Sequence, residues 1–256
     1  MICAKSHLAQ CLREGTQQSH TAAENTAFMK CFLKGVVERE PFRRLTADLY
    51  WVYSTLEAAM EQHLDNPVVH SLYFPELKRT AKLEADLAYY WGENWRDIKP
   101  SAAGERYVDR IKAVAKWQPP LLIAHAYVRY MGDLSGGQSL RTIARSALNL
   151  PPDRGTGLHE FDHFPTPQSR REFKLTYRDA LNSLELDAPL VEAIVAEANR
   201  AFALNRSLFH ELEPAVKAAV GDHVFDLLTR QDKPGSTIRS AERATDPNAG
   251  ELVAAE

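Results

Sequence analysis

Hydrophobic residues recur every three to four positions along most of the chain, which is the period of an amphipathic α-helix. The clearest run follows Pro41, a residue that suits the first turn of a helix. The apolar positions on one face of this run are Phe42, Leu45, Leu49, Val52, Leu56 and Met60. No sustained alternation of period two and no hairpin turn between β-rich runs interrupts the pattern. The sequence therefore predicts an all-α fold of one domain without internal repeats.

Proline, glycine and polar clusters divide this pattern into separate helices. The expected helices cover residues 8–20, a short segment after Asn25, a long segment from Pro41, then 75–92, a segment from Ser101, 120–148, 168–184, 189–212 and 214–230. The last of these begins at Pro214 and is expected to bend at Gly221. Residues 231–256 are polar and are expected to form a disordered tail.

The helix expected over 120–148 contains an unusual cluster of glycines, Gly132, Gly136 and Gly137, around Asp133. Each glycine destabilises a helix interior by about 1 kcal/mol relative to alanine. Gly132 and Gly136 share one face, and Arg129 and Asp133 lie on the adjacent face. Close packing of two helices through small residues would explain the glycines, and so would a flat ligand lying against bare backbone. A phosphate loop is disfavoured, because it requires a preceding strand and a lysine after its last glycine.

Two histidines are candidate ligands for a metal ion. His20 lies near the end of the first expected helix, and Glu24 follows four residues later, within reach of the imidazole. A carboxylate that orients a histidine is the usual outer partner of a metal ligand. The alternative is a histidine at a helix C-terminus that interacts with the helix dipole and pairs with Glu24. His125 is a rival ligand, because it lies seven residues before Gly132 on roughly the same face.

The segment "HEFDH", from His159 to His163, matches the H-E-x-x-H pattern of zinc hydrolases. Zinc binding by that pattern requires both histidines on one face of a helix. Gly155 and Gly157 precede the segment and Pro165 follows it, so no helix is expected there. A zinc hydrolase is therefore the disfavoured alternative.

Composition sets limits on location and partners. The 256 residues carry a net charge of −3, which gives no basis for expecting a nucleic-acid partner. There is no run of about 18 apolar residues and no signal-peptide pattern at the start, so a cytoplasmic protein without a membrane partner is expected. The three cysteines form no CxxC pair, and neither a disulfide framework nor a cysteine-based zinc site is expected.

Taken together, these segments resemble heme oxygenases. "AYVRYMGDLSGGQ" is similar to the signature of the family's distal helix, and "SHTAAEN" to the segment that supplies the iron-binding histidine. Further similar segments follow in the family's order: "LYWVYSTLE", "YFPEL", "FKLTYRDALNSLEL" and "NRAFALNRSLFHEL". The resemblance covers about residues 8–230. It implies a catalytic domain over 1–230, with heme b held between a proximal and a distal helix.

The resemblance also implies roles for individual residues. His20 would bind the heme iron, oriented by Glu24, while Gly132 and Gly136 would leave room for O2 on the opposite side. Asp133 would hold water beside the oxygen. Further positions match the family's water network and pocket: Tyr53, Arg129, Tyr127, Phe202, Asn205 and Phe209.

The heme propionates require cations at the open edge of such a pocket. Lys174 and Arg178 lie four residues apart and match this role, although a solvated basic face would have the same pattern. Arg13 matches another basic position of the family. Gln17 stands where some relatives have lysine, which weakens the transferred propionate clamp.

The resemblance implies that heme is cleaved with O2 and reducing electrons to biliverdin IXα, carbon monoxide and ferrous iron. "CFLKGVVERE" and "SAAGERYVDR" are most similar to the soluble cyanobacterial class, whose electron donor is ferredoxin. A bilin reductase is a possible downstream partner. The alternative from another class is a heme carrier of the same fold, against which Gly132 and Asp133 argue, because binding alone does not require a distal proton network.

Overall fold

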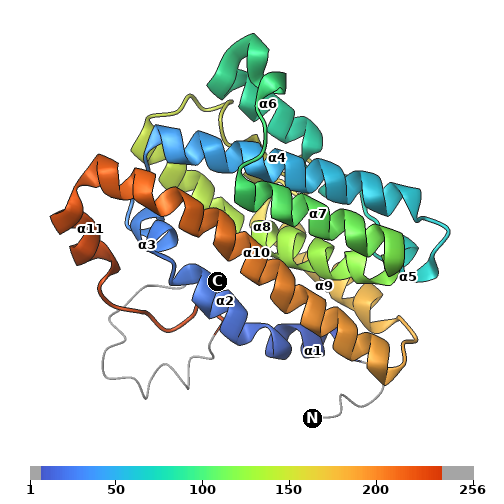
Figure 1. Ribbon diagram of the computed structural model, residues 1–256. Coiled ribbons are helices and arrows are strands. Elements are labelled where there is room, and N and C mark those ends of the chain that lie inside the picture. Colours follow the sequence, from blue (N-terminus) through green and yellow to red (C-terminus); the bar gives the residue numbers. More distant parts are fainter. Residues whose placement is uncertain (1–6, 238–256) are drawn as a thin grey trace.

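The structure is a computed structural model that describes residues 7–237, and every regular element within that range is helical (Figure 1). The α-helices are α1 (Leu8–Gly15), α2 (Gln17–Glu24), α3 (Ala27–Leu33), α4 (Arg39–Gln62), α5 (Pro67–Ser71), α6 (Thr80–Trp91), α7 (Ala102–Trp117), α8 (Leu122–Leu148), α9 (Pro167–Asn182), α10 (Ala188–Val220) and α11 (Asp222–Thr229). Short 3-10 turns lie at Pro75–Leu77, Gly92–Asp97, Pro119–Leu121 and Gly157–His159. The predicted all-α fold is confirmed.

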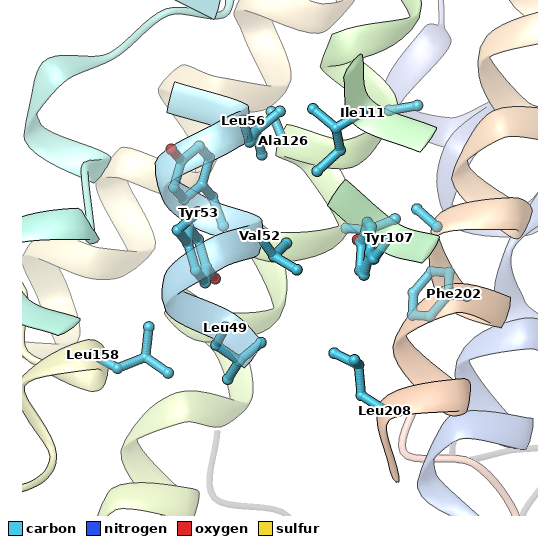
Figure 2. Packing of buried hydrophobic residues seen from close by; sticks show 14 of the residues in the cluster. Leu49, Val52, Tyr53, Leu56, Tyr107, Ile111, Ala126, Leu158, Phe202 and Leu208 are labelled. Atoms are coloured by element: carbon cyan, nitrogen blue, oxygen red, sulfur yellow. The ribbon is translucent and has the colours of Figure 1, made fainter. Parts of the chain in front are cut away.

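The core lies between the long helices α4, α7, α8 and α10, which pack against one another. Figure 2 shows Val52 of α4, Tyr107 of α7 and Phe202 of α10 on its inner faces. The helix α10 also packs against α1, α2 and α3. It thereby connects the first helices of the chain to the centre of the molecule.

The first predicted helix is interrupted in the structure. The break lies at Thr16, whose hydroxyl donates to the carbonyl of Leu12 at 2.6 Å while the chain turns into α2. A Thr hydroxyl that bonds the carbonyl four residues earlier commonly bends a helix. The prediction of one continuous helix over 8–20 was therefore wrong, and His20 lies within α2.

The C-terminal helices also divide differently from the prediction. Pro214 begins no new helix, because α10 continues through it to Val220. The break falls at Gly221, which has a φ of 83° that favours glycine, and α11 follows. The helix expected over 75–92 begins only at Thr80, after the turn Pro75–Leu77.

The chain after α11 returns to α2. The backbone N–H of Lys233 donates to Asn25 Oδ1, and Asn25 Nδ2 donates back to the Lys233 carbonyl, both at 2.8 Å. Ser236 donates to the Glu24 carboxylate through its backbone N–H at 2.8 Å and through its hydroxyl. Residues 232–237, here named the C-terminal segment, thus contact α2, whereas the rest of the expected tail lies outside the described residues.

Two further expectations bear on the same range of the chain. No helix within residues 7–237 is long and apolar enough to cross a membrane. Cys31 is a buried free thiol.

Candidate active site

The histidine expected to bind a metal lies on α2 and is partly exposed. Its Nδ1 lies 3.5 Å from Glu24 Oε2, and its ring meets the edge of Phe202 with centroids 5.6 Å apart. Burial alone would raise the pKa of Glu24, but the hydrogen bond and charge of His20 and the bonds from Ser236 lower it. Because Nδ1 faces Glu24, Nε2 points away from that carboxylate and is the nitrogen suited to bind a ligand.

The glycines of α8 leave a bare strip of backbone. Gly132 and Gly136 are exposed, and a Cβ atom added at either would meet no atom within 4 Å. The two helices α2 and α8 both pack on α10, and they are not among the closely packed helix pairs of the described chain. Helix–helix packing therefore does not explain these two glycines, and a flat ligand fits beside the strip.

Gly137 has a different purpose from its two neighbours. A Cβ atom at this position would lie 3.0 Å from Nδ1 of His159. The glycine therefore allows the turn Gly157–His159 to approach α8 closely.

A buried network of polar side chains connects α8 to α4 and α10. Tyr53 of α4 donates its hydroxyl hydrogen bond to Oδ2 of Asp133. Arg129 donates from Nε to the Tyr53 oxygen at 3.2 Å and from Nη1 to Asn205 Oδ1 at 2.6 Å. Its Nη2 lies 3.8 Å from Oδ1 of Asp133. All four residues are buried, so the alternative of a solvated surface pair for Arg129 and Asp133 is wrong.

The electrostatics of this network keep its donors protonated. Burial raises the pKa of Tyr53 well above its usual value, and the negative charge of Asp133 raises it further against the opposing charge of Arg129. Burial acts to lower the pKa of Arg129, but Tyr53 and Asp133 outweigh it and the net shift is upward. The Asp133 carboxylate is thus surrounded by groups that donate rather than accept hydrogen bonds.

The remaining predicted pocket residues fall into two places. Phe209 stacks on Phe28 with ring centroids 5.4 Å apart, on the α10 side of α3. Tyr127 is close enough to Arg178 and Arg13 for their charges to oppose the upward shift that burial causes in its pKa. These two arginines therefore share one edge of the site with Tyr127.

The predicted propionate clamp is brought together only in part. Lys174 lies near Arg178, and its pKa is lowered first by burial and then by that neighbouring charge. Gln17 instead donates from Nε2 to the backbone carbonyl of Thr237 at 3.5 Å. Gln17 is therefore engaged with the C-terminal segment.

The rival histidine His125 is a buried structural residue. It is fully buried, and its Nε2 lies 2.9 Å from Oε1 of Glu197. The Glu197 carboxylate also accepts two hydrogen bonds from Arg110. The sequence analysis missed Glu197, which nothing in its local pattern distinguishes from a solvated residue of α10.

The zinc pattern is not formed. His159 lies in the turn Gly157–His159 and is buried, whereas His163 is exposed and the residues between them are not helical. Within residues 7–237 no cluster of three His, Cys, Asp or Glu side chains could hold a metal ion. The zinc hydrolase alternative was therefore wrong. What the sequence analysis did not anticipate is that Nδ1 of His159 lies 4.0 Å from Oδ1 of Asp133.

A histidine with one ring nitrogen turned away from its carboxylate partner, an open glycine strip and a buried carboxylate network suit an enzyme that binds a flat ligand. The chain belongs to the heme oxygenase family, because the family model described as "Heme oxygenase" matches residues 6–211. It is therefore an enzyme of this family, whose substrates are heme and O2. The heme-carrier alternative is wrong.

Similar proteins are known from cyanobacteria and animals. Heme oxygenase 2 of Synechocystis sp. PCC 6803 is 62% identical over 233 residues, which cover 91% of this chain and 93% of that protein. Heme oxygenase 2 of Mus musculus is 44% identical over 248 residues, covering 96% of this chain and 78% of that protein.

Solved structures agree with this assignment. A crystal structure of heme oxygenase-2 from Synechocystis sp. PCC 6803 in complex with heme and NO has a TM-score of 0.90 and covers 91% of this chain and 96% of that chain. A crystal structure of heme oxygenase-1 from the same organism in complex with heme is 51% identical, with a TM-score of 0.81, and covers 87% of this chain and all of that chain.

Proposed function

We propose that this enzyme cleaves heme at the α-meso carbon and releases biliverdin IXα, carbon monoxide and ferrous iron, with O2 and electrons from a reduced donor. The observation that carries the proposal is the placement of Asp133. Its carboxylate is buried, accepts the hydrogen bond of Tyr53, and lies one residue from the open strip at Gly132. A carboxylate in that position controls protons next to the face where O2 reacts.

The proximal side would hold the heme iron through Nε2 of His20. Glu24, 3.5 Å from Nδ1, favours the tautomer with the proton on that nitrogen and so leaves Nε2 free to coordinate. Phe202 supports the ring from the side. Protein groups thus set the orientation of the substrate, while the redox chemistry belongs to the porphyrin itself.

The distal side would supply room and protons. Gly132 and Gly136 have no side chain to exclude O2 from the heme face. Asp133 holds a water molecule there, and that water delivers protons to the oxygen during its reduction. Tyr53 and Arg129 keep the carboxylate fixed and are supported in turn by Asn205.

The open edge would fix the rotation of the porphyrin in its plane. The charges of Arg13 and Arg178 act on Tyr127, and Lys174 lies near Arg178, which supports a clamp of positive charge for the propionates. That rotation decides which meso carbon faces the distal oxygen. Gln17 stays outside this clamp, since it is bonded to Thr237.

An acidic electron donor such as ferredoxin would dock on a basic rim that includes Arg13, Arg141, Lys174 and Arg178. Electrostatic steering of this kind weakens with salt, because the Debye length is about 8 Å at physiological ionic strength. Turnover supported by ferredoxin should fall with added salt, whereas turnover supported by ascorbate should change little. Equal sensitivity of both would contradict docking on this rim. The bilin product would pass to a bilin reductase in the cytoplasm.

The direct test of the proposed reaction uses purified protein, hemin, O2 and ascorbate. The visible spectrum should show a histidine-ligated heme band that decays as a bile-pigment band grows, and chromatography should identify the IXα isomer. A heme band that stays constant under these conditions would contradict catalysis. A different biliverdin isomer would contradict the proposed clamp alone.

A further inference from the structure

The inner face of the distal network includes a residue that the family signature does not contain. His159 is buried beside Asp133, in the turn Gly157–His159, and its Nδ1 has no hydrogen-bond partner among the described residues. A buried polar atom without a partner is uncommon in folded proteins and calls for an explanation. The nearest carboxylate oxygen is Oδ1 of Asp133, at 4.0 Å.

The backbone of the turn that carries His159 is fixed from several sides. Asp86 accepts hydrogen bonds from the backbone N–H groups of Gly157 and Leu158 at 2.9 and 3.0 Å. On the other side of the turn, Gln138 donates from its side chain to the His159 carbonyl at 2.6 Å. The next carbonyl, that of Glu160, accepts from Arg79 at 2.6 Å.

The distal helix is shaped to receive this ring. A Cβ atom at Gly137 would lie 3.0 Å from Nδ1 and 3.6 Å from Cγ of His159, so a larger residue there would push the imidazole away by a few tenths of an ångström. Gly137 follows Asp133 by one turn, and both therefore present the same face of α8 to the imidazole. The close approach places the ring nitrogen beside the carboxylate.

The charges around His159 favour its neutral form. Burial lowers the pKa of His159, and the negative charge of Asp133 opposes that shift. The positive charges of Arg129, Arg79 and Arg141 lower it further. A neutral imidazole carries one N–H group, and the carboxylate closest to Nδ1 is that of Asp133.

We propose that His159 is a positioning residue of the distal network, whose Nδ1–H is directed at Oδ1 of Asp133 and orients this carboxylate toward the glycine strip. The inference rests on the proposed role of Asp133 in proton delivery. Tyr53 occupies Oδ2 of the carboxylate. A donor on the Oδ1 side fixes its remaining rotation, and closing the 4.0 Å gap to a hydrogen bond requires a shift of about 1 Å.

The first test concerns the tautomer and uses the full-length protein without heme. Two-bond ¹H–¹⁵N NMR spectra of the imidazole rings should show His159 neutral at pH 7 with its proton on Nδ1, and His159→Phe identifies the signal. A proton on Nε2 alone, or a charged ring at this pH, would overturn the proposal. This result does not depend on catalysis, so it distinguishes failure of the inference from failure of the proposed function.

The second test uses His159→Phe and His159→Asn, because the amide nitrogen of Asn occupies nearly the position of Nδ1. Without the His159 donor, the Asp133 carboxylate accepts a stronger hydrogen bond from neighbouring water. That bond makes it harder for the water to lose its proton. The pH midpoint between the acid and alkaline spectra of the ferric heme complex should rise by about half a unit in His159→Phe. Bilin yield per heme should fall about five-fold. His159→Asn should restore both toward the original values.

A matched control comes from the same loop. His163 is exposed, and His163→Phe should leave the spectral midpoint and the bilin yield unchanged. Gly137→Ala, whose added Cβ would press on the ring, should change both quantities in the same direction as His159→Phe but by less. An unchanged midpoint and yield in a folded His159→Phe protein would overturn the proposal. If that variant does not fold, His159→Asn identifies the NMR signal, and the NMR result still decides the matter.

Discussion

The two helices that carry the candidate site residues, α2 and α8, differ in how deeply their polar side chains are buried and how many hydrogen bonds hold them. The helix α2 has eight residues and one buried hydrophobic side chain, Ala23, and its histidine is paired mainly with one carboxylate. The helix α8 has 27 residues, and its Arg129 and Asp133 are buried and share hydrogen bonds with α4 and α10. On the proposed function, heme binding depends on one nitrogen that few other groups contact, whereas proton control depends on several side chains that hydrogen-bond one another.

This difference predicts how each side responds to substitution. A single exposed ligand can be lost without unfolding the protein, because few other groups depend on it. In a buried network each member satisfies another, so removing one leaves its partners without hydrogen bonds. The strongest loss of binding is therefore expected from α2 and the strongest loss of chemistry from α8.

The largest effect on binding is expected from His20→Ala. Removing the imidazole deletes the nitrogen proposed to bind the heme iron while leaving the core of the protein intact. The histidine-ligated heme spectrum should be lost, and far-UV circular dichroism should be unchanged. Added imidazole should restore the spectrum, since it supplies the missing nitrogen in the space that remains.

His125→Ala is the matched comparison on α8. This histidine is fully buried and bonded to Glu197, so its loss should lower stability but keep the ligated spectrum in the folded protein. A normal heme spectrum in His20→Ala together with a lost spectrum in His125→Ala would exchange their roles.

A large effect on stability is expected from Glu197→Gln, behind the first turns of α8. Burial acts to raise the pKa of Glu197, but hydrogen bonds from Arg110 and His125 lower it to about 2. Removing one charge of a buried ion pair destabilises a protein by about 3 kcal/mol. Denaturant unfolding at pH 7 should show a loss of this size, whereas bilin yield per bound heme should stay the same.

The pH dependence of that contribution has a definite sign. The pKa of the folded state lies below the ordinary value of 4.5, so the stabilisation is complete above about pH 4.5 and is lost as the pH falls toward 2. The difference in stability between the original protein and Glu197→Gln should therefore shrink over this range. A constant difference between pH 5 and pH 2 would show that the charge of Glu197 does not contribute.

The smallest effect is expected from the C-terminal segment. A chain that ends after Gln231 loses the contacts of Lys233 with Asn25 and of Ser236 with Glu24, whereas a chain that ends after Thr237 keeps them. Because these bonds hold the partner of His20, heme should dissociate a few-fold faster from the shorter chain, about the effect of one hydrogen bond. Identical dissociation rates, measured by heme transfer to apomyoglobin, would show that the segment does not support the proximal side.

The fold was largely accessible from the sequence because amphipathic periodicity reports directly which faces are buried. The apolar run from Phe42 to Met60 corresponds to α4, and the glycine-containing helix corresponds to α8. The wrong helix boundaries lie where a local backbone conformation overrides the hydrophobic pattern. Thr16 interrupts a helix through the hydrogen bond of its own side chain. Pro214, by contrast, lies inside α10 and does not end it.

The candidate site divides in the same way. His20 and Glu24 lie four residues apart on one helix, as do Arg129 and Asp133 on another, so the shared face of each pair followed from the sequence. The position of His159 beside Asp133 depends instead on a loop fixed by Asp86 and Gln138 from other elements. Contacts between segments far apart in the chain produce no periodic pattern in the sequence from which they could be predicted. The pairing of Gln17 with Thr237 escaped prediction for the same reason.

The measurement that tests the central claim most directly is the bilin yield of Asp133→Ala reconstituted with hemin, O2 and ascorbate, compared with Asp133→Asn. The account predicts that both variants bind heme through His20 with a normal ligated spectrum. Asp133→Ala should produce about a hundred-fold less bilin, the usual size of a lost proton-transfer group, and Asp133→Asn should retain part of the yield because an amide still holds water. A near-normal bilin yield from folded, heme-loaded Asp133→Ala would contradict the claim that α8 controls the chemistry.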